Sequence, residues 1–169
     1  AQCLVGSEMC IRDSNLSLLT LGFLFHHPIA VTIYIIITGS LRAVTGGYHC
    51  KTRISCYILS YTVFSIYLLT IATIPMISAY ILIPIYIICW ILILVVSPVD
   101  TPNKVFSESA KKTARKKTYI IFFFNSIFTI LSLLLHWNKG LIFIDLSLII
   151  CATGLYTGYI SNIRRHHES

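Results

Sequence analysis

The sequence predicts an all-α, polytopic α-helical membrane protein with about five to six transmembrane helices. Hydrophobic residues make up 56% of the 169 residues and charged residues only 11%, whereas about a quarter of the residues in a soluble domain are charged. The stretch between Arg53 and Asp100 carries no charge. At about 1.5 Å per helical residue, it is long enough to cross a hydrocarbon core of about 30 Å twice. We therefore expect a helical hairpin there.

The apolar runs before and after this stretch predict the other spans. Asn15 to Phe25 is too short to cross a bilayer and precedes the helix-breaking turn His26-His27-Pro28, so we interpret it as a truncated first span. Ile29 to Leu41 forms the next span and ends where charge reappears. The remaining spans are expected over Tyr57 to Ile74 and Ala79 to Val96, which form the hairpin, and over Tyr119 to Leu135 and Leu141 to Ile160.

The basic residues are grouped between the apolar runs. Lys and Arg number three in Arg42 to Arg53, six in Pro98 to Thr118 and two in the C-terminal tail, against Lys139 alone on the other side. The positive-inside rule places these three segments in the cytoplasm. The same grouping argues against nucleic acid as a partner despite the net charge of +7, because no basic, aromatic-interleaved surface runs along the chain. The sequence thus predicts a multi-pass protein of the cell membrane.

The two ends of the chain are expected to differ from the membrane domain at residues 15–165. Ala1 to Ser14 has neither the order of a signal peptide nor a helical apolar period, and it resembles the translated adapter ends of raw sequence assemblies, so we interpret it as non-native. Residues 166–169 are expected to form a cytoplasmic tail.

The six cysteines do not have the layout of a disulfide scaffold. Cys89 and Cys151 lie inside apolar runs, and Cys50 and Cys56 flank a basic segment. We expect free thiols.

The segment from Arg42 to Cys56 is a polar island between two apolar runs and holds the candidate chemistry. His49 can accept a proton near neutral pH, and Cys56 supplies a soft nucleophile. Lys51 and Arg53 would favour the thiolate electrostatically. These residue types suffice for cysteine-type acyl transfer.

The spacing of His49 and Cys56 requires a turn. Seven residues along a straight helix return to nearly the same face, but about 10.5 Å further along the axis. Contact therefore needs His49 on a turn that folds back toward the start of the Tyr57 helix, and Gly46-Gly47 provides backbone freedom just upstream. Two other interpretations stay open from the residues alone: His49 and Cys56 as bystanders in a loop, or a metal site with Cys50, which lacks a fourth ligand.

Two motifs follow one another along the chain. The first is Arg42, then Gly46-Gly47-Tyr48-His49, with Cys56 seven residues later, and the second is Ser97-Pro98-Val99-Asp100-Thr101-Pro102-Asn103-Lys104. Together and in this order, they resemble the AgrB family of membrane cysteine peptidases. The likeness covers roughly residues 16 to 165, and family members normally carry a longer N-terminal segment, so the chain is similar to an N-terminally truncated copy.

The resemblance implies a catalytic dyad of His49 and Cys56. It implies cleavage of the C-terminal part of an AgrD-like autoinducer propeptide through a Cys56 thioester, followed by cyclisation to a thiolactone or lactone for quorum sensing. It implies no metal and no cofactor. The family usually has a small residue at the position of Cys50. The alternative from another class is a non-enzymatic membrane transporter or sensor subunit for a peptide, which the scarcity of polar residues in the hairpin disfavours.

Further residues are expected to bind or position the substrate, or to have structural roles. Asp100 and Asn103 match the second motif and would position its turn, and the lysines before Thr118 could either bind an acidic propeptide segment or set topology. Asp145 is expected to snorkel toward water. Gly154 and Gly158 could bring a helix of the same chain or of a homodimer close. The predicted substrate-binding or positioning residues are Arg42, Gly46, Gly47, Lys51, Arg53, Asp100, Asn103 and Lys104.

Overall fold

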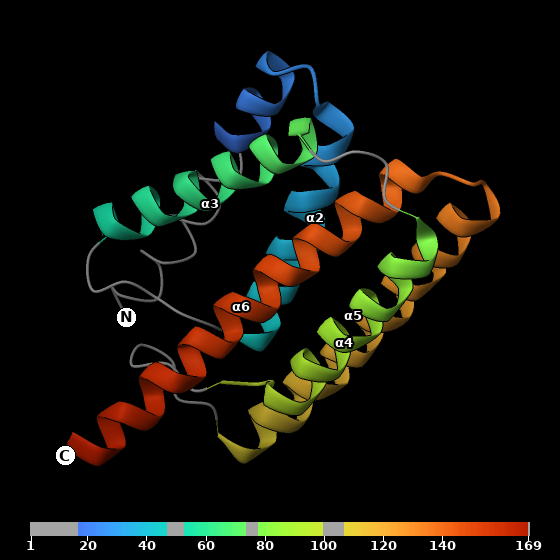
Figure 1. Ribbon diagram of the computed structural model, residues 1–169. Coiled ribbons are helices and arrows are strands. Elements are labelled where there is room, and N and C mark those ends of the chain that lie inside the picture. Colours follow the sequence, from blue (N-terminus) through green and yellow to red (C-terminus); the bar gives the residue numbers. More distant parts are fainter. Residues whose placement is uncertain (1–16, 47–52, 74–77, 100–106, 169) are drawn as a thin grey trace.

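The computed structural model describes residues 17–46, 53–73, 78–99 and 107–168, and its elements there are all helices, with no strand. Residues 17–24 form a short helix before the first labelled one. The labelled helices are shown in Figure 1. This confirms the predicted all-α class. The helices are α2 (Pro28–Thr45), α3 (Arg53–Thr73), α4 (Ala79–Val96), α5 (Glu108–Leu134) and α6 (Asn138–Glu168).

Four of these helices are long and apolar enough to cross a membrane: α2, α4, α5 and residues 138–161 of α6. The apolar part of α3, Tyr57–Thr73, is shorter. Of the five to six spans that the sequence predicts, four therefore reach full length among the described helices. Large hydrophobic side chains of α4 and α5, such as Ile91 and Phe124, point away from the bundle. Soluble monomers rarely expose continuous apolar surface of this extent, so these outer faces suit lipid.

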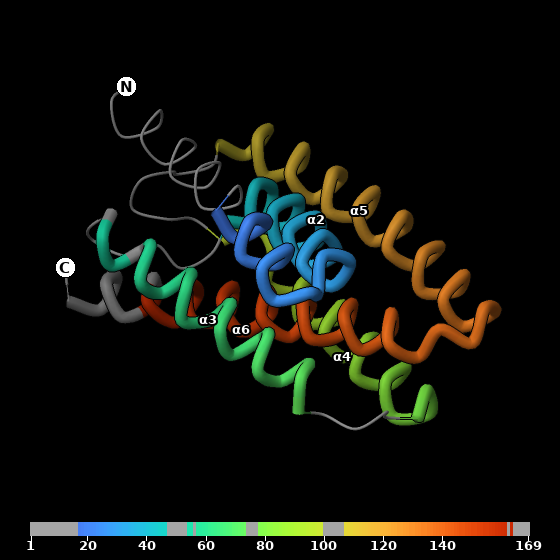
Figure 2. The backbone as a smooth tube through the Cα atoms, turned by 90° about the horizontal axis from the view of Figure 1, so that it is seen from above, coloured from blue at the N-terminus to red at the C-terminus, as the bar shows by residue number. Residues whose placement is uncertain are grey.

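Helix α6 packs against α2, α3, α4 and α5 and is the most buried of the four candidate spans. Figure 2 shows α2 between α5 on one side and α6 on the other. The buried residues of α6 recur every three or four positions and so form one stripe. The main hydrophobic cluster joins residues of α6, α2 and α4. Among them are Ile144, Leu148, Ala152 and Leu155 of α6, Ile33, Ile37 and Leu41 of α2, and Trp90 and Ile93 of α4.

The expected hairpin of α3 and α4 does not form, because α6 lies between the two helices (Figure 1). Instead α3 packs its aromatic side chains on α2: the rings of Tyr34 and Tyr67 lie 4.7 Å apart between centroids. The hydroxyl of Tyr67 donates to the main-chain carbonyl of Ala30 at 2.9 Å. The absence of charge correctly predicted helices here, but it carried no information on which faces would pair.

The helix at residues 17–24 folds back onto α2 through the predicted His26-His27-Pro28 turn. His26 has φ 58°, and the His27 N–H donates to the Gly22 carbonyl at 3.1 Å, a helix-ending pattern. Pro28 begins α2, where its missing N–H costs nothing. Gly22 faces Val31 so closely that an added Cβ would lie 2.7 Å from the Val31 Cβ. The close approach therefore requires glycine.

Helix α5 begins at Glu108, eleven positions before the predicted span at Tyr119, so the predicted loop from Pro98 to Thr118 is wrong in its second half. The Ser107 hydroxyl caps the helix by accepting from the Ala110 N–H at 3.3 Å. The segment that follows is rich in Ala, Lys and Arg, which favour helix. The basic residues mark the end of the predicted membrane span, but the helix continues through them.

Hydroxyl groups inside the spans are satisfied by their own helices. Thr38 donates to the Tyr34 carbonyl at 2.6 Å and Thr118 to the Ala114 carbonyl at 3.1 Å. Ser132 does the same with the Phe128 carbonyl at 2.9 Å. Hydrocarbon offers no water to bond these groups, so bonding back to the preceding turn lets small polar residues lie at helix contacts.

We predict that Gly22→Ala destabilises the protein by about 1–3 kcal/mol, because the new methyl group would overlap the branched side chain of Val31. Thermal unfolding in detergent measures this as a lower Tm. Gly154→Ala is the matched control, since the closest atom to its added Cβ is 3.6 Å away. An equal Tm for the two variants would contradict the packing of residues 17–24 on α2.

Candidate functional site

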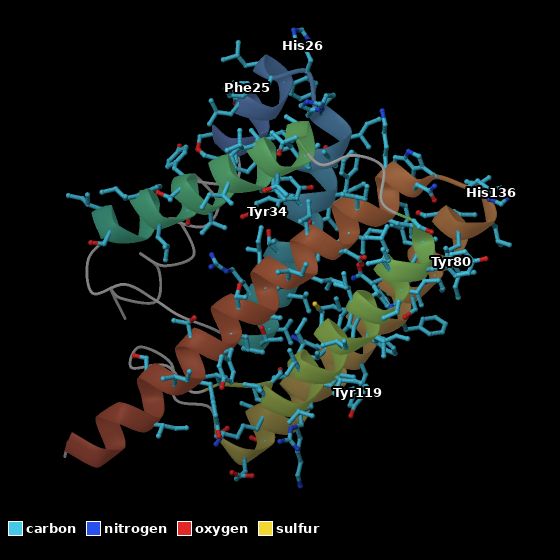
Figure 3. The ribbon with its side chains drawn as sticks, in the orientation of Figure 1. Phe25, His26, Tyr34, Tyr80, Tyr119 and His136 are labelled. Carbon is cyan, nitrogen blue, oxygen red and sulfur yellow. The ribbon has the colours of Figure 1, made fainter. Side chains whose placement is uncertain are left out.

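The bundle has two chemically different ends. Figure 3 shows His26, Tyr80 and His136 toward one end and Tyr119 toward the other. The end near Tyr119 carries Arg42 in the last turn of α2 and the lysines and arginine at the start of α5. We call it the basic end. Lys139 is the second residue of α6, shortly after His136, and lies at the opposite end, as the charge grouping predicted.

The two sequence motifs meet at the basic end. The Val99 N–H donates to the main-chain carbonyl of Thr45 at 3.0 Å, which ties the segment after α4 to the last residue of α2. Thr45, Ser97 and Val99 are each at most 3% exposed. We call Thr45, Gly46, Ser97 and Val99 the motif junction. The two parts of the junction lie about fifty positions apart in the sequence, and the fold brings them into direct contact.

Gly46 ends α2 in a conformation that favours glycine, with φ 75° and ψ −147°. Side chains with a Cβ are strained there. The preceding residue is held in the helix, since the Thr45 hydroxyl donates to the Leu41 carbonyl at 2.9 Å. Gly46 was predicted as a positioning residue, and it turns the chain out of the helix immediately before the segment that contains His49.

Ser97 follows the last turn of α4, where its N–H donates to the Ile93 carbonyl at 2.9 Å. Its hydroxyl is buried and has no hydrogen-bond partner among the described residues. A buried hydroxyl without a partner is costly. Sequence reasoning included Ser97 in the second motif but assigned it no role, and only its burial in the folded chain distinguishes it.

Arg42 is exposed in the last turn of α2 and reaches across to α6. A Cβ added to Gly154 would lie 3.6 Å from the Arg42 Nη2 atom. Arg42 of α2 therefore lies beside Gly154 of α6 in the same chain, at a distance where an added methyl group would make ordinary contact. Arg42 makes no ion pair with any residue that the structure describes.

The predicted dyad lies largely outside the described residues. This holds for Gly47, His49, Cys50 and Lys51, and in the second motif for Asp100, Asn103 and Lys104. Arg53 begins α3 and Cys56 is its fourth residue, although neither side chain is described. The main chain of Cys56 thus belongs to the first turn of a helix, where amide N–H groups have no partner within the helix. The dyad itself stays a prediction.

Asp145 does not snorkel, and this expectation is wrong. It is 4% exposed, and its Oδ2 atom has no partner among the described residues. Its helix packs against α4, which carries Tyr86 and Cys89. The Nε1 atom of Trp90 is likewise buried and unpaired within the described part of the chain. The packing of α6 at the centre of the bundle orients this carboxyl inward, which hydropathy alone does not predict.

Cys89 and Cys151 are free and buried, which confirms the expected thiols at these two positions. Within residues 17–46, 53–73, 78–99 and 107–168, no three His, Cys, Asp or Glu side chains gather as a metal site would require. The open metal alternative involved His49, Cys50 and Cys56, whose side chains the structure does not describe.

Fold and surface define a multi-pass α-helical membrane protein whose two polar motifs converge at one end. Comparison with protein families matches residues 14–158 to accessory gene regulator B. The chain therefore belongs to the AgrB family, whose members are membrane-embedded, process autoinducers and act on a propeptide. No curated protein and no solved structure matches the chain.

We predict that Val99→Pro destabilises the protein by about 1–3 kcal/mol, because it removes the N–H that pairs with the Thr45 carbonyl. Val99→Ala is the control that trims the buried side chain but keeps this N–H. Thermal unfolding and propeptide processing should both fall further for Val99→Pro. Equal losses in the two variants would mean that side-chain packing, and not this bond, holds the motifs together.

We predict that Asp145→Asn keeps or raises the Tm in detergent at neutral pH, since it replaces an unpaired buried carboxyl with a neutral group of the same shape. Glu108→Gln is the control at an exposed carboxylate, where little change is expected. A markedly lower Tm for Asp145→Asn than for Glu108→Gln would show that the carboxylate has a stabilising partner.

Proposed function

We propose that the chain is a membrane cysteine endopeptidase that cleaves the C-terminal part of an AgrD-like propeptide through a thioester on Cys56 and promotes its cyclisation. The observation that carries this proposal is the family match over residues 14–158, which includes both motifs. The contact between the motifs at the Val99–Thr45 hydrogen bond supports it, because residues of both can then serve one site.

In the first step, the Cys56 thiolate attacks the carbonyl carbon of the scissile peptide bond. The bond to nitrogen breaks, and protonated His49 gives its proton to the departing amine. The C-terminal fragment leaves with a free amino group, and the N-terminal part remains on Cys56 as a thioester. These are the roles of nucleophile and general acid in cysteine-type acyl transfer.

In the second step, a thiol or hydroxyl within the bound peptide attacks the thioester. His49 accepts its proton, the Cys56 thiolate departs, and a thiolactone or lactone ring closes. Exchange of one thioester for another is close to isoenergetic, so water must be kept from the acyl-enzyme. A site at the boundary between helix bundle and lipid favours this exclusion.

The helical start of α3 supports Cys56 as the nucleophile. Cys56 is the fourth residue of α3, and the unpaired amides and dipole of a first helical turn stabilise a thiolate. Lys51 and Arg53 add positive charge on either side of the helix start in the sequence. Each of these effects increases the thiolate fraction at neutral pH.

The substrate would be positioned from the basic end. Arg42 reaches α6 with an exposed guanidinium and no ion pair to a described residue, which suits a carboxylate or a polarised carbonyl of the propeptide. Gly46 and Gly47 would let the peptide main chain approach. The further proposed positioning residues are Lys51, Arg53, Asp100, Asn103 and Lys104.

The basic end would face the cytoplasm of a bacterial cell, where the propeptide is made. Arg42 and the basic start of α5 lie at this end, and Lys139 lies at the other, the asymmetry that the positive-inside rule associates with a cytoplasmic side. A homodimer is compatible with this arrangement.

The proposal predicts that Cys56→Ala and His49→Ala abolish processing when the chain is co-expressed with candidate propeptides, with rates at least about 100-fold lower. The measurement is the mass of the released C-terminal fragment. Cys50→Ala, Cys89→Ala and Cys151→Ala are matched controls that remove a thiol elsewhere and should process normally. Unchanged cleavage in Cys56→Ala would overturn the assignment, and peptide export without cleavage in every variant would favour the transporter.

A further inference from the structure

The outward face of α5 carries an open groove of about 530 Å³. Its lining residues recur at intervals of three or four along the helix and so share one face. They change in character along its length, from basic near the N-terminus through Tyr119 to apolar. In order, they are Lys112, Arg115, Lys116, Tyr119, Ile120 and Phe123.

The groove points away from the bundle. Ala114 and Thr118, on the opposite face of α5, are 6% and 1% exposed and pack inward. Tyr119 and Phe123 are 57% and 62% exposed, and Figure 3 shows Tyr119 near the basic end. Beyond Phe123, toward the C-terminus of α5, the exposed apolar surface continues through Phe124 and Ile127. The groove therefore spans the boundary between the basic end and the lipid-facing surface.

The cations of the groove differ from a neighbouring lysine in their pairing within the described part of the chain. Lys112, Arg115 and Lys116 are exposed and form no ion pair with a described residue. The neighbouring Lys111 is different, because it lies 4.0 Å from Glu108. Three unpaired positive charges on consecutive turns of one face form a site for a phosphate group, which an arginine can bind through two parallel hydrogen bonds.

We propose that this groove binds an anionic phospholipid, with its phosphate held by Lys112, Arg115 and Lys116 and an acyl chain lying along Ile120 and Phe123. Eleven residues separate Lys112 from Phe123, or about 16 Å along the helix. One leaflet with its headgroups is about 20 Å thick, so the polarity of the groove changes over a length similar to that of a lipid. Tyr119 lies at the change, as tyrosine does at membrane interfaces.

A phospholipid fits this groove better than an acidic peptide does. A peptide carboxylate could pair with the basic residues, but Ile120 and Phe123 would remain in contact with hydrocarbon and contribute nothing to its recognition. A phospholipid uses both parts at once. The bound lipid anchors the start of α5, and hence the chain that follows the motif junction, at the membrane surface.

The test measures phosphatidylglycerol binding to the purified full chain in detergent by native mass spectrometry, with phosphatidylcholine and inorganic phosphate as comparison ligands. The groove variant is Lys112→Gln with Arg115→Gln and Lys116→Gln. The matched control removes the same charge elsewhere, as Lys111→Gln with Lys117→Gln and Lys139→Gln. We expect the groove variant to bind phosphatidylglycerol at least about 10-fold more weakly and the control to change less than about 3-fold.

A second variant, Phe123→Ala, separates the acyl contact from the charge and leaves all basic residues in place. It should weaken phosphatidylglycerol binding several-fold without changing the binding of inorganic phosphate. Equal losses in the two charge variants would overturn the proposal in favour of general electrostatic attraction. Unchanged binding in Phe123→Ala, together with displacement of the lipid by an acidic peptide, would overturn it in favour of a peptide site. Neither outcome depends on peptidase activity.

Discussion

The packing of α6 against its neighbours is the constraint on which the rest of the structure depends. This helix contacts α2, α3, α4 and α5, and its buried stripe supplies one side of the main hydrophobic cluster. With α2 and α4 both fixed on α6, their C-terminal ends lie at the same end of the bundle. The Val99–Thr45 hydrogen bond then closes the short gap between them. Two motifs that are distant in sequence thus become neighbours because of one central helix.

Exclusion of water governs the polar groups within the bundle. Serine and threonine hydroxyls bond to carbonyls of their own helices, so they add polarity at no cost in unpaired groups. Asp145, Trp90 and Ser97 depart from this pattern, since each has a buried polar atom without a partner among the described residues. Ser97 lies at the motif junction, whereas Asp145 and Trp90 lie between α4 and α6. Buried polar atoms without a hydrogen-bond partner mark positions where packing or function outweighs the cost of the missing bond.

Hydropathy and charge predicted the helices well and their pairing poorly. The bounds of α4 agree with the predicted span, and the basic residues lie at the expected end. The start of α5 and the partner of α3 were wrong, because charge was equated with loop and sequence neighbours with packed pairs. Asp145 faces inward because the orientation of α6 about its own axis places this position in the bundle. At the site, Arg42 and Gly46 could be selected from the motif, but the burial of Ser97 and the Thr45–Val99 bond exist only in the folded chain.

The proposed function combines a membrane fold with thiol chemistry. Its nucleophile is the sulfur of Cys56, in the first turn of α3. The most direct measurement is the intact mass of the purified chain after brief reaction with its propeptide. The account predicts an added mass equal to the N-terminal part of the peptide, mapped to Cys56, lost on treatment with hydroxylamine and absent from Cys56→Ala. Cleavage of the propeptide with no such adduct on Cys56, or with an adduct on another cysteine, would contradict it.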